Sequence, residues 1–255
     1  MKQFWKKIFA PVAEYYRDLR PRNIATQKYN HSLLLLFWAV YGFMFLSLER
    51  FFPVWWPARY SEAVCFSVHC PLDDLIPFNE FFLIPYLFWF AFLILPGIYF
   101  FLWEPRAFRD FQWAIILTYS VTTIIYILWP TKQELRPDAF PRDNFLTDFV
   151  RDYYDFDTNT NVCPSLHVLG ALATMFAGLH SKTLRGWGWK VFFVLSTILI
   201  SMSTVFLKQH SIVDVFAALG VGFVCYAVQF WLYPVLEKRR LARRAKKESI
   251  AEKGD

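Results

Sequence analysis

Two histidines and an aspartate have the types and spacing needed for nucleophilic chemistry. His210 and Asp214 are four residues apart, so on a helix they share one face. A carboxylate that fixes the tautomer of an imidazole leaves the other ring nitrogen free to attack an electrophile. His167, in a Pro-Ser-x-His stretch, could protonate a leaving alkoxide. The three side chains together are typical of phosphoryl transfer.

The same stretches hold groups that could bind a phosphate. A transferring phosphoryl group needs cations and hydrogen-bond donors around its oxygens. The helix predicted after Pro164 would add backbone amides and a favourable dipole. Lys132 has a second interpretation, in which it only reaches toward lipid headgroups. The candidate phosphate-binding residues are Arg136, Ser165, Lys208 and Lys132.

The elements that carry these residues are membrane helices, by composition. Hydrophobic residues make up 56% of the 255 residues and charged residues 19%, against about 45–50% and about 25% in soluble domains. The apolar residues also come in long runs. This excludes a soluble enzyme and favours an integral membrane bundle.

We predict an all-α fold with six transmembrane helices. A bilayer core about 30 Å thick needs about 20 mostly apolar residues per span. The fourth predicted span is rich in small residues that allow close helix packing, and we expect it at the centre of the bundle. Its alternative is a re-entrant or surface segment. The six predicted spans are Ser32–Leu48, Phe81–Trp103, Phe111–Trp129, Pro164–Leu179, Val191–Leu207 and Val213–Leu236.

The distribution of Lys and Arg predicts the orientation of the chain. With six spans both termini lie on one side, and that side would hold 20 of the 27 basic residues. Positive loops stay in the cytoplasm, so we expect both termini to be cytoplasmic. The polar stretches around Arg136, His167 and His210 then all lie at the outer face, and we expect an active site there. Short loops favour a bacterial inner membrane.

Three regions follow from these patterns. Residues 1–31 form a cytoplasmic amphipathic segment at the membrane interface, since they have apolar positions but no signal-peptide core. Residues 32–236 form the six-helix membrane domain. Residues 237–255 form a basic tail that could bind anionic lipids, or that simply anchors the last helix. The net charge of +6 is explained by topology, and we expect no nucleic-acid partner.

Three features of the outer loops have open interpretations. Cys65 and Cys70 could form a disulfide or remain free thiols; with His69 they lack the fourth ligand of a zinc site. Three acidic residues could contact a headgroup or could simply lie in a solvated loop. They are Asp73, Asp74 and Glu80. Residues 143–161 show helical spacing of apolar pairs, which predicts an interfacial helix that covers the site.

The order of these motifs resembles that of the type-2 phosphatidic acid phosphatase superfamily. Its motifs are written KxxxxxxRP, PSGH and SRxxxxxHxxxD, and the matching segments here are Arg136-Pro137, Pro164–His167 and Ser203–Asp214. The resemblance implies that His210 attacks phosphorus to form a phosphohistidine, that Asp214 orients it, and that His167 is the general acid and later activates water. It also implies six helices and no metal or other cofactor.

The chain departs from the family motifs at three positions. Lys132 precedes Arg136 by four residues rather than seven, the glycine of the second motif is Leu166, and the arginine of the third motif is Thr204. Lys208 is a possible replacement cation, although a lysine cannot form the bidentate contacts of an arginine. These departures resemble the branch that includes phosphoinositol-transferring sphingolipid synthases.

The expected function is therefore hydrolysis of a lipid phosphate. The substrate would be a membrane lipid with a phosphate monoester or pyrophosphate, such as a phosphatidate, a phosphatidylglycerophosphate or a polyprenyl pyrophosphate. One alternative is a phosphotransferase that moves a phospho-headgroup between lipids. Another is a non-catalytic lipid transporter or binding protein, which the complete set of His167, His210 and Asp214 argues against. The oligomeric state is left open.

Overall fold

The computed structural model describes residues 2–236 and residue 238. Helices dominate the described chain, and its two strands are two residues long each. The predicted basic tail, 237–255, lies outside the described residues apart from Lys238. In chain order the elements are α1 Lys2–Tyr16, η1 Pro21–Asn23, η2 Asn30–Leu35, α2 Leu36–Leu46, η3 Ser47–Phe51, α3 Phe52–Trp55, α4 Pro57–Tyr60, η4 Glu62–Val64, β1 Phe66–Ser67, α5 Pro71–Leu75, η5 Glu80–Phe82, α6 Leu83–Trp103, α7 Pro105–Leu128, β2 Thr131–Lys132, α8 Phe145–Phe156, α9 Leu166–His180, α10 Trp187–Phe206, α11 Ile212–Ala227 and η6 Val228–Leu232.

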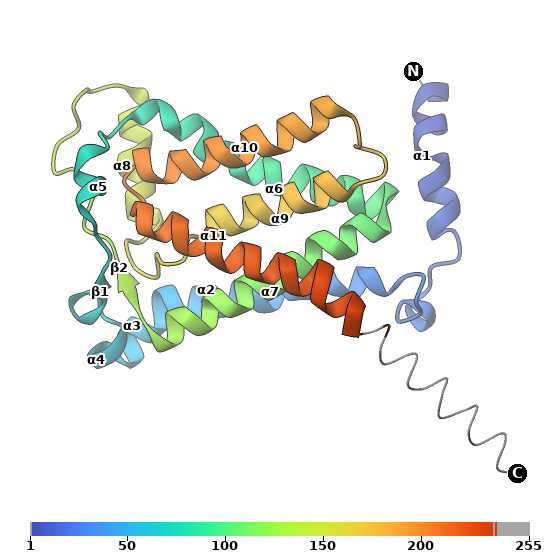
Figure 1. Cartoon of the computed structure of the whole chain (residues 1–255), viewed down its shortest axis with the longest axis horizontal. Helices are drawn as coiled ribbons and strands as arrows, with labels where there is room; N and C mark the ends of the chain where they lie inside the picture. The colour runs from blue at the N-terminus through green and yellow to red at the C-terminus, as the bar shows by residue number, and fades with distance from the viewer. Residues whose placement is uncertain (1, 237, 239–255) are drawn as a thin grey trace, which may run out of the picture.

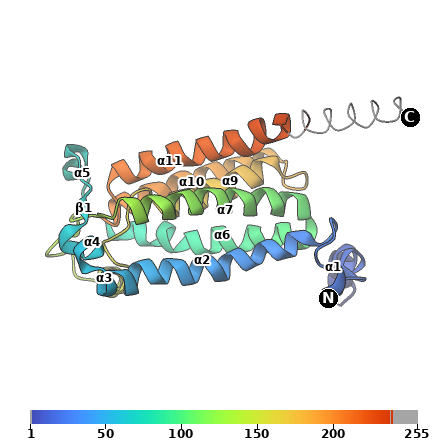
Figure 2. The same cartoon turned by 90° about the horizontal axis from the view of Figure 1, so that it is seen from below.

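Helices α2, α6, α7, α9, α10 and α11 run side by side and form one bundle (Figures 1 and 2). The predicted all-α membrane fold is confirmed. Among residues 2–236, five helical segments are long and apolar enough to cross a bilayer. They are Asn30–Trp55, Glu80–Trp103, Pro105–Leu128, Trp187–Phe206 and Ile212–Leu236.

The remaining predicted span, Pro164–Leu179, corresponds to α9, which has only 15 residues. At 1.5 Å per residue it is about 22 Å long, shorter than a bilayer core of about 30 Å. A count of six spans therefore stays a prediction. The expected central position of this helix agrees with the structure, since α9 contacts α6, α7, α10 and α11.

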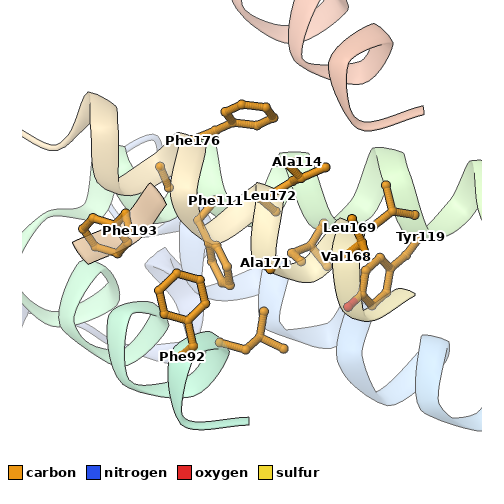
Figure 3. Packing of buried hydrophobic residues seen from close by; sticks show 14 of the residues in the cluster. Phe92, Phe111, Ala114, Tyr119, Val168, Leu169, Ala171, Leu172, Phe176 and Phe193 are labelled. Carbon is orange, nitrogen blue, oxygen red and sulfur yellow. The ribbon is translucent and has the colours of Figure 1, made fainter. Parts of the chain in front are cut away.

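The core forms around the small residues of α9. Leu169, Ala171 and Leu172 are buried in one cluster that also contains Phe92 and Phe193 of the neighbouring helices (Figure 3). Glycine is required where two helices approach most closely. A Cβ atom at Gly170 would lie 2.7 Å from the Tyr119 hydroxyl, and one at Gly178 would overlap the ring of Phe193.

The connecting segments divide between the two ends of the bundle. One end carries the strands and the short helices α3, α4, α5 and α8, whereas α1 and the end of α11 lie at the other (Figures 1 and 2). The parallel pair β1–β2 joins the first of these loops to the segment before Arg136. Helix α8, predicted within residues 143–161, lies across the ends of the bundle helices. All three predicted polar motifs belong to this end.

Candidate active site

His210 and Asp214 form a buried pair at the start of α11. The Nδ1 atom of His210 lies 3.1 Å from Oδ2 of Asp214. The same oxygen accepts the backbone N–H of Ser211 at 3.0 Å, and the Ser211 side chain caps the helix by accepting from Val213 N. His210 is 8% exposed and Asp214 is fully buried. This contact leaves Nε2 as the ring nitrogen available for chemistry.

His167 lies in the first turn of α9, opposite His210. Its ring packs between Tyr86 and Trp89 of α6, at centroid distances of 4.5 and 4.6 Å. The centroids of the two histidine rings are 5.9 Å apart. That separation is too long for a direct hydrogen bond but allows both rings to reach one phosphoryl group. In the part of the chain that the structure describes, His167 has no hydrogen-bond partner.

Ser165 lies at the N-cap of α9 and joins the two histidine-bearing helices. Its backbone N–H donates to the carbonyl oxygen of Asp214 at 3.2 Å. The side chain is fully buried, and its hydroxyl has no hydrogen-bond partner among residues 2–236. A buried unpaired hydroxyl costs free energy unless a ligand satisfies it. Ser165 is thus available to donate to a phosphate oxygen, helped by the start of the helix.

Arg136 is held beside the histidines by the segment that ends α8. It donates to the carbonyl oxygens of Tyr154 and Asp157, at 2.8 and 2.6 Å, and to the side-chain oxygen of Gln209 at 2.7 Å. Its guanidinium also lies 4.4 Å from the Tyr154 ring centroid. Burial lowers the pKa of Arg136 from its usual value, while the Asp157 carboxylate opposes the shift. The Nε atom is buried without a partner in the described chain.

The two candidate lysines have other partners. Lys132 forms an ion pair with Glu134 at 2.8 Å, and no contact in residues 2–236 joins it to the histidines. Lys208 is nearly buried, and its Nζ donates to the carbonyl oxygen of Asp73 at 2.7 Å. Burial lowers the pKa of Lys208, and the nearby acidic side chain of Asp73 acts in the opposite direction. The phosphate-binding roles of both lysines stay predictions.

Three neighbours of the histidines were not expected from the sequence. Gln209 links the His210 turn to Arg136. The Asp157 carboxylate accepts a hydrogen bond from the hydroxyl of Tyr86 at 3.1 Å. Burial raises the pKa of Asp157, and the nearby His210 acts to lower it. Cys163 faces Asp214. Burial, and to a smaller extent the Asp214 carboxylate, raises the pKa of the Cys163 thiol to about 12. Gln209 is adjacent to His210 and Cys163 directly precedes the Pro164–His167 motif, so both had a local signal in the sequence, whereas Asp157 had none.

The acidic residues of the loop that precedes α6 do not form one cluster. Asp73 is fully buried against the start of α11, whereas Asp74 pairs with His69 at 2.8 Å. Glu80 is buried and accepts from Arg142 and from Asn144, the N-cap of α8. Asp74 is exposed, as expected for a solvated loop, whereas Asp73 and Glu80 are buried against other parts of the protein.

The cysteines of that loop are free thiols, so no disulfide joins Cys65 to Cys70. Cys65 is buried, and its thiol contacts the carbonyl oxygen of Tyr60. Of the two interpretations left open by the sequence, the free thiols agree with the structure.

A family model described as the PAP2 superfamily matches residues 109–238, a little over half of the chain. The chain belongs to the PAP2 superfamily. This confirms the resemblance to the type-2 phosphatidic acid phosphatases and assigns the chain to proteins that hydrolyse or transfer phosphate esters. No curated protein and no solved structure matches the chain.

The structure explains one departure from the PAP2 motifs. Thr204 replaces the arginine of the third motif, and its hydroxyl donates back to the carbonyl oxygen of Ser201 at 2.8 Å. The Thr204 carbonyl accepts the N–H groups of Gln209 and His210. The Thr204 side chain therefore supplies no cation, and only its backbone contacts the turn that carries His210. Arg136 is the arginine that is connected to the His210 turn, by its hydrogen bond to Gln209.

Proposed function

We propose that this protein is a metal-independent lipid phosphate phosphatase that works through a phosphohistidine. The observation that carries the proposal is the buried contact of His210 Nδ1 with Asp214, together with His167 at a ring distance of 5.9 Å. A histidine held in this way can act as a nucleophile through Nε2. The substrate is a phosphate monoester or pyrophosphate of a membrane lipid.

In the first half-reaction, His210 Nε2 attacks phosphorus and the bond from phosphorus to the leaving oxygen breaks. Protonated His167 gives its proton to that oxygen, and Asp214 stabilises the positive charge that develops on His210. The Ser165 hydroxyl and Arg136 donate to the phosphoryl oxygens. The products are the dephosphorylated lipid and a phosphohistidine.

In the second half-reaction, His167 accepts a proton from water. The hydroxide so formed attacks phosphorus, and the bond between phosphorus and His210 Nε2 breaks. Inorganic phosphate leaves, and both histidines return to their starting protonation states. The burial of His210 keeps bulk water away until the lipid product has left.

The lipid nature of the substrate is supported by apolar cavities between the membrane-facing helices. A cavity of about 540 Å³ lies between α2, α6 and α7 and is lined almost wholly by apolar side chains. Trp89, which packs against His167, is one of its lining residues. Ile94 and Ile98 on the same wall are exposed at the surface of the bundle. Such a cavity suits a hydrocarbon chain that enters from the bilayer.

Phosphate release by the purified full-length protein tests the proposal. The assay uses long-chain lipid phosphates in detergent with a chelator, and His210→Ala is compared with His69→Ala, an exposed histidine of the same end. Wild type and His69→Ala should release phosphate at similar rates, and His210→Ala should release none. Near-normal release by folded His210→Ala would contradict the mechanism.

A phosphotransferase would use the same histidines, and the shielded position of His210, 8% exposed, suits either reaction. The same assay separates the two if a diacylglycerol or inositol acceptor is added. Transfer of the phospho-headgroup without phosphate release would replace hydrolysis by transfer. Neither product from any lipid, with the fold intact, would favour a non-catalytic lipid-binding protein.

A further inference from the structure

The first outer loop places a buried carboxylate against the turn that carries His210. Asp73, in α5, precedes the part of the chain that matches the PAP2 family model. Its Oδ2 accepts the hydroxyl of Ser211 at 2.6 Å and the N–H of Cys70 at 2.9 Å, and its Oδ1 accepts the N–H of Ile212 at 2.8 Å. The carbonyl oxygen of Asp73 accepts Nζ of Lys208.

These contacts lie on both sides of the candidate nucleophile. Lys208 and Ser211 flank Gln209 and His210 in the turn between α10 and α11. Lys208 has a φ of 53°, a left-handed backbone that residues other than glycine rarely adopt. The bond from its side chain to Asp73 therefore holds an uncommon conformation in place.

The hydrogen bonds continue from Asp73 to His210. Ser211 donates its hydroxyl to Asp73 and its backbone N–H to Oδ2 of Asp214. That same Asp214 oxygen contacts Nδ1 of His210. The path of hydrogen bonds from the Asp73 carboxylate to the His210 imidazole thus runs through two residues, Ser211 and Asp214. A change at Asp73 acts first on Ser211, which also caps α11, and then on the orientation of the imidazole.

Asp73 cannot bind substrate directly from this position. It is fully buried, and both of its carboxylate oxygens accept hydrogen bonds from the protein. Ordinary loop packing would not need a buried carboxylate, because burying a charge is costly unless it is paired and hydrogen-bonded. The loop supplies this charge at the turn of His210.

We propose that Asp73 is a positioning residue for His210, which it acts on through Ser211 and Lys208. The inference rests on the proposed role of His210 as nucleophile. Docking of the first outer loop then becomes a requirement for turnover, and Lys208 serves the turn rather than the phosphate.

The test measures kcat and KM of the full-length protein in detergent for Asp73→Asn, Ser211→Ala and the double variant. A misplacement of about 1 Å can cost about 10²-fold in rate. We expect each single variant to lower kcat about 10- to 100-fold with KM within about two-fold, because the phosphate-binding groups stay in place. The double variant should be no slower than the slower single variant, since both changes remove one interaction.

Two controls separate positioning from general stability. Asp74→Asn changes the next residue of α5, which is exposed and paired with His69, and should leave kcat unchanged. Ser211→Thr keeps a hydroxyl and should recover most of the loss seen with Ser211→Ala. If Asp73→Asn does not fold, the test is the comparison of kcat between Ser211→Ala and Ser211→Thr, because each of these variants changes only one small side chain.

Wild-type kcat in folded Asp73→Asn or Ser211→Ala would overturn the inference, as would losses that multiply in the double variant. An equal loss in Ser211→Thr and Ser211→Ala would also overturn it. These results leave the proposed function intact, because that function fails only if His210→Ala remains active.

Discussion

Arg136 donates three of the five N–H groups of a guanidinium to protein acceptors. Those acceptors are the carbonyl oxygens of Tyr154 and Asp157 and the side chain of Gln209. The contacts fix the plane of the guanidinium, and they leave Nε and one N–H of Nη1 for a ligand. Arg136 is therefore held in one orientation rather than acting as a mobile positive charge.

Arg136→Lys separates the fixed orientation of the side chain from its charge. A lysine keeps the positive charge but cannot satisfy the three fixed acceptors that hold the guanidinium. We expect kcat/KM for the lipid phosphate to fall about 100-fold, the scale of losing an oriented donor to a transition state. Arg151→Lys is the matched control, since Arg151 is exposed and pairs with Asp148. A loss below three-fold in Arg136→Lys would mean that charge alone suffices.

The candidate site shows how far single residues could be predicted from the sequence. His210 and Asp214 follow from helical spacing, because both belong to one short segment. Asp73 carries no local signal, because its partner Ser211 is 138 residues away and only the folded chain brings them together. The motif spacing already set Lys132 apart from Arg136, but only the folded chain shows that Lys132 pairs with Glu134 and Lys208 with the carbonyl of Asp73.

Among the helices, α9 determines how the two histidines approach each other. It carries Ser165 at its cap and His167 in its first turn, and it packs against four other helices. Its small residues allow this packing. Trp89 contacts both Gly170 and His167, so the fit of α9 against α6 also fixes the imidazole.

Gly170→Ala tests this coupling between packing and site. The added Cβ would lie 2.7 Å from the Tyr119 hydroxyl and 3.0 Å from Nε1 of Trp89, so one of them must move. Overpacking of this kind costs about 1–3 kcal/mol. We expect a lower thermal unfolding temperature in detergent and slower phosphate release.

Gly220→Ala is the control for that experiment, because a Cβ at Gly220 meets no heavy atom within 4 Å. Its unfolding temperature should equal or slightly exceed that of the wild type. Equal unfolding temperatures for the two alanine variants would show that α9 tolerates the extra methyl group.

The helical elements were largely predictable, and their exceptions have physical reasons. Apolar runs predicted the ends within a few residues for α6, for α10 and for the helical segment Ile212–Leu236, which contains α11 and η6. Helix α7 begins at Pro105, six residues earlier than expected, because its first turn is polar and gives no apolar signal. The length of α9 could not be judged, since a helix surrounded by protein need not match the bilayer.

For the whole molecule, several exposed tryptophans lie at the two ends of the bundle. Trp55 in α3, the adjacent Trp56, and Trp129 after α7 are exposed at the end that carries the histidines. Trp187 at the start of α10 and Trp231 in η6 are exposed at the other end. Tryptophan is enriched at both membrane–water interfaces, so we expect the interfaces at these two ends.

We predict that the end with the histidines faces outward. In a variant without native cysteines, Asp143→Cys introduces a thiol at this end and Lys182→Cys one at the other; both positions are exposed. A membrane-impermeant maleimide should label Asp143→Cys in intact cells, and Lys182→Cys only after permeabilisation. The reverse pattern would place the active site and the excess of basic residues on the opposite sides from those expected.

The short length of α9 has a consequence for how the protein is made. A helix of about 22 Å with Ser165 and His167 at its start is poorly suited to stand alone in lipid. Its partners α10 and α11 are synthesised after it, and only six residues separate it from α10. His210 and Asp214 belong to α11, the last of the bundle helices in the described chain, so the histidine site can assemble only after α11 has been made.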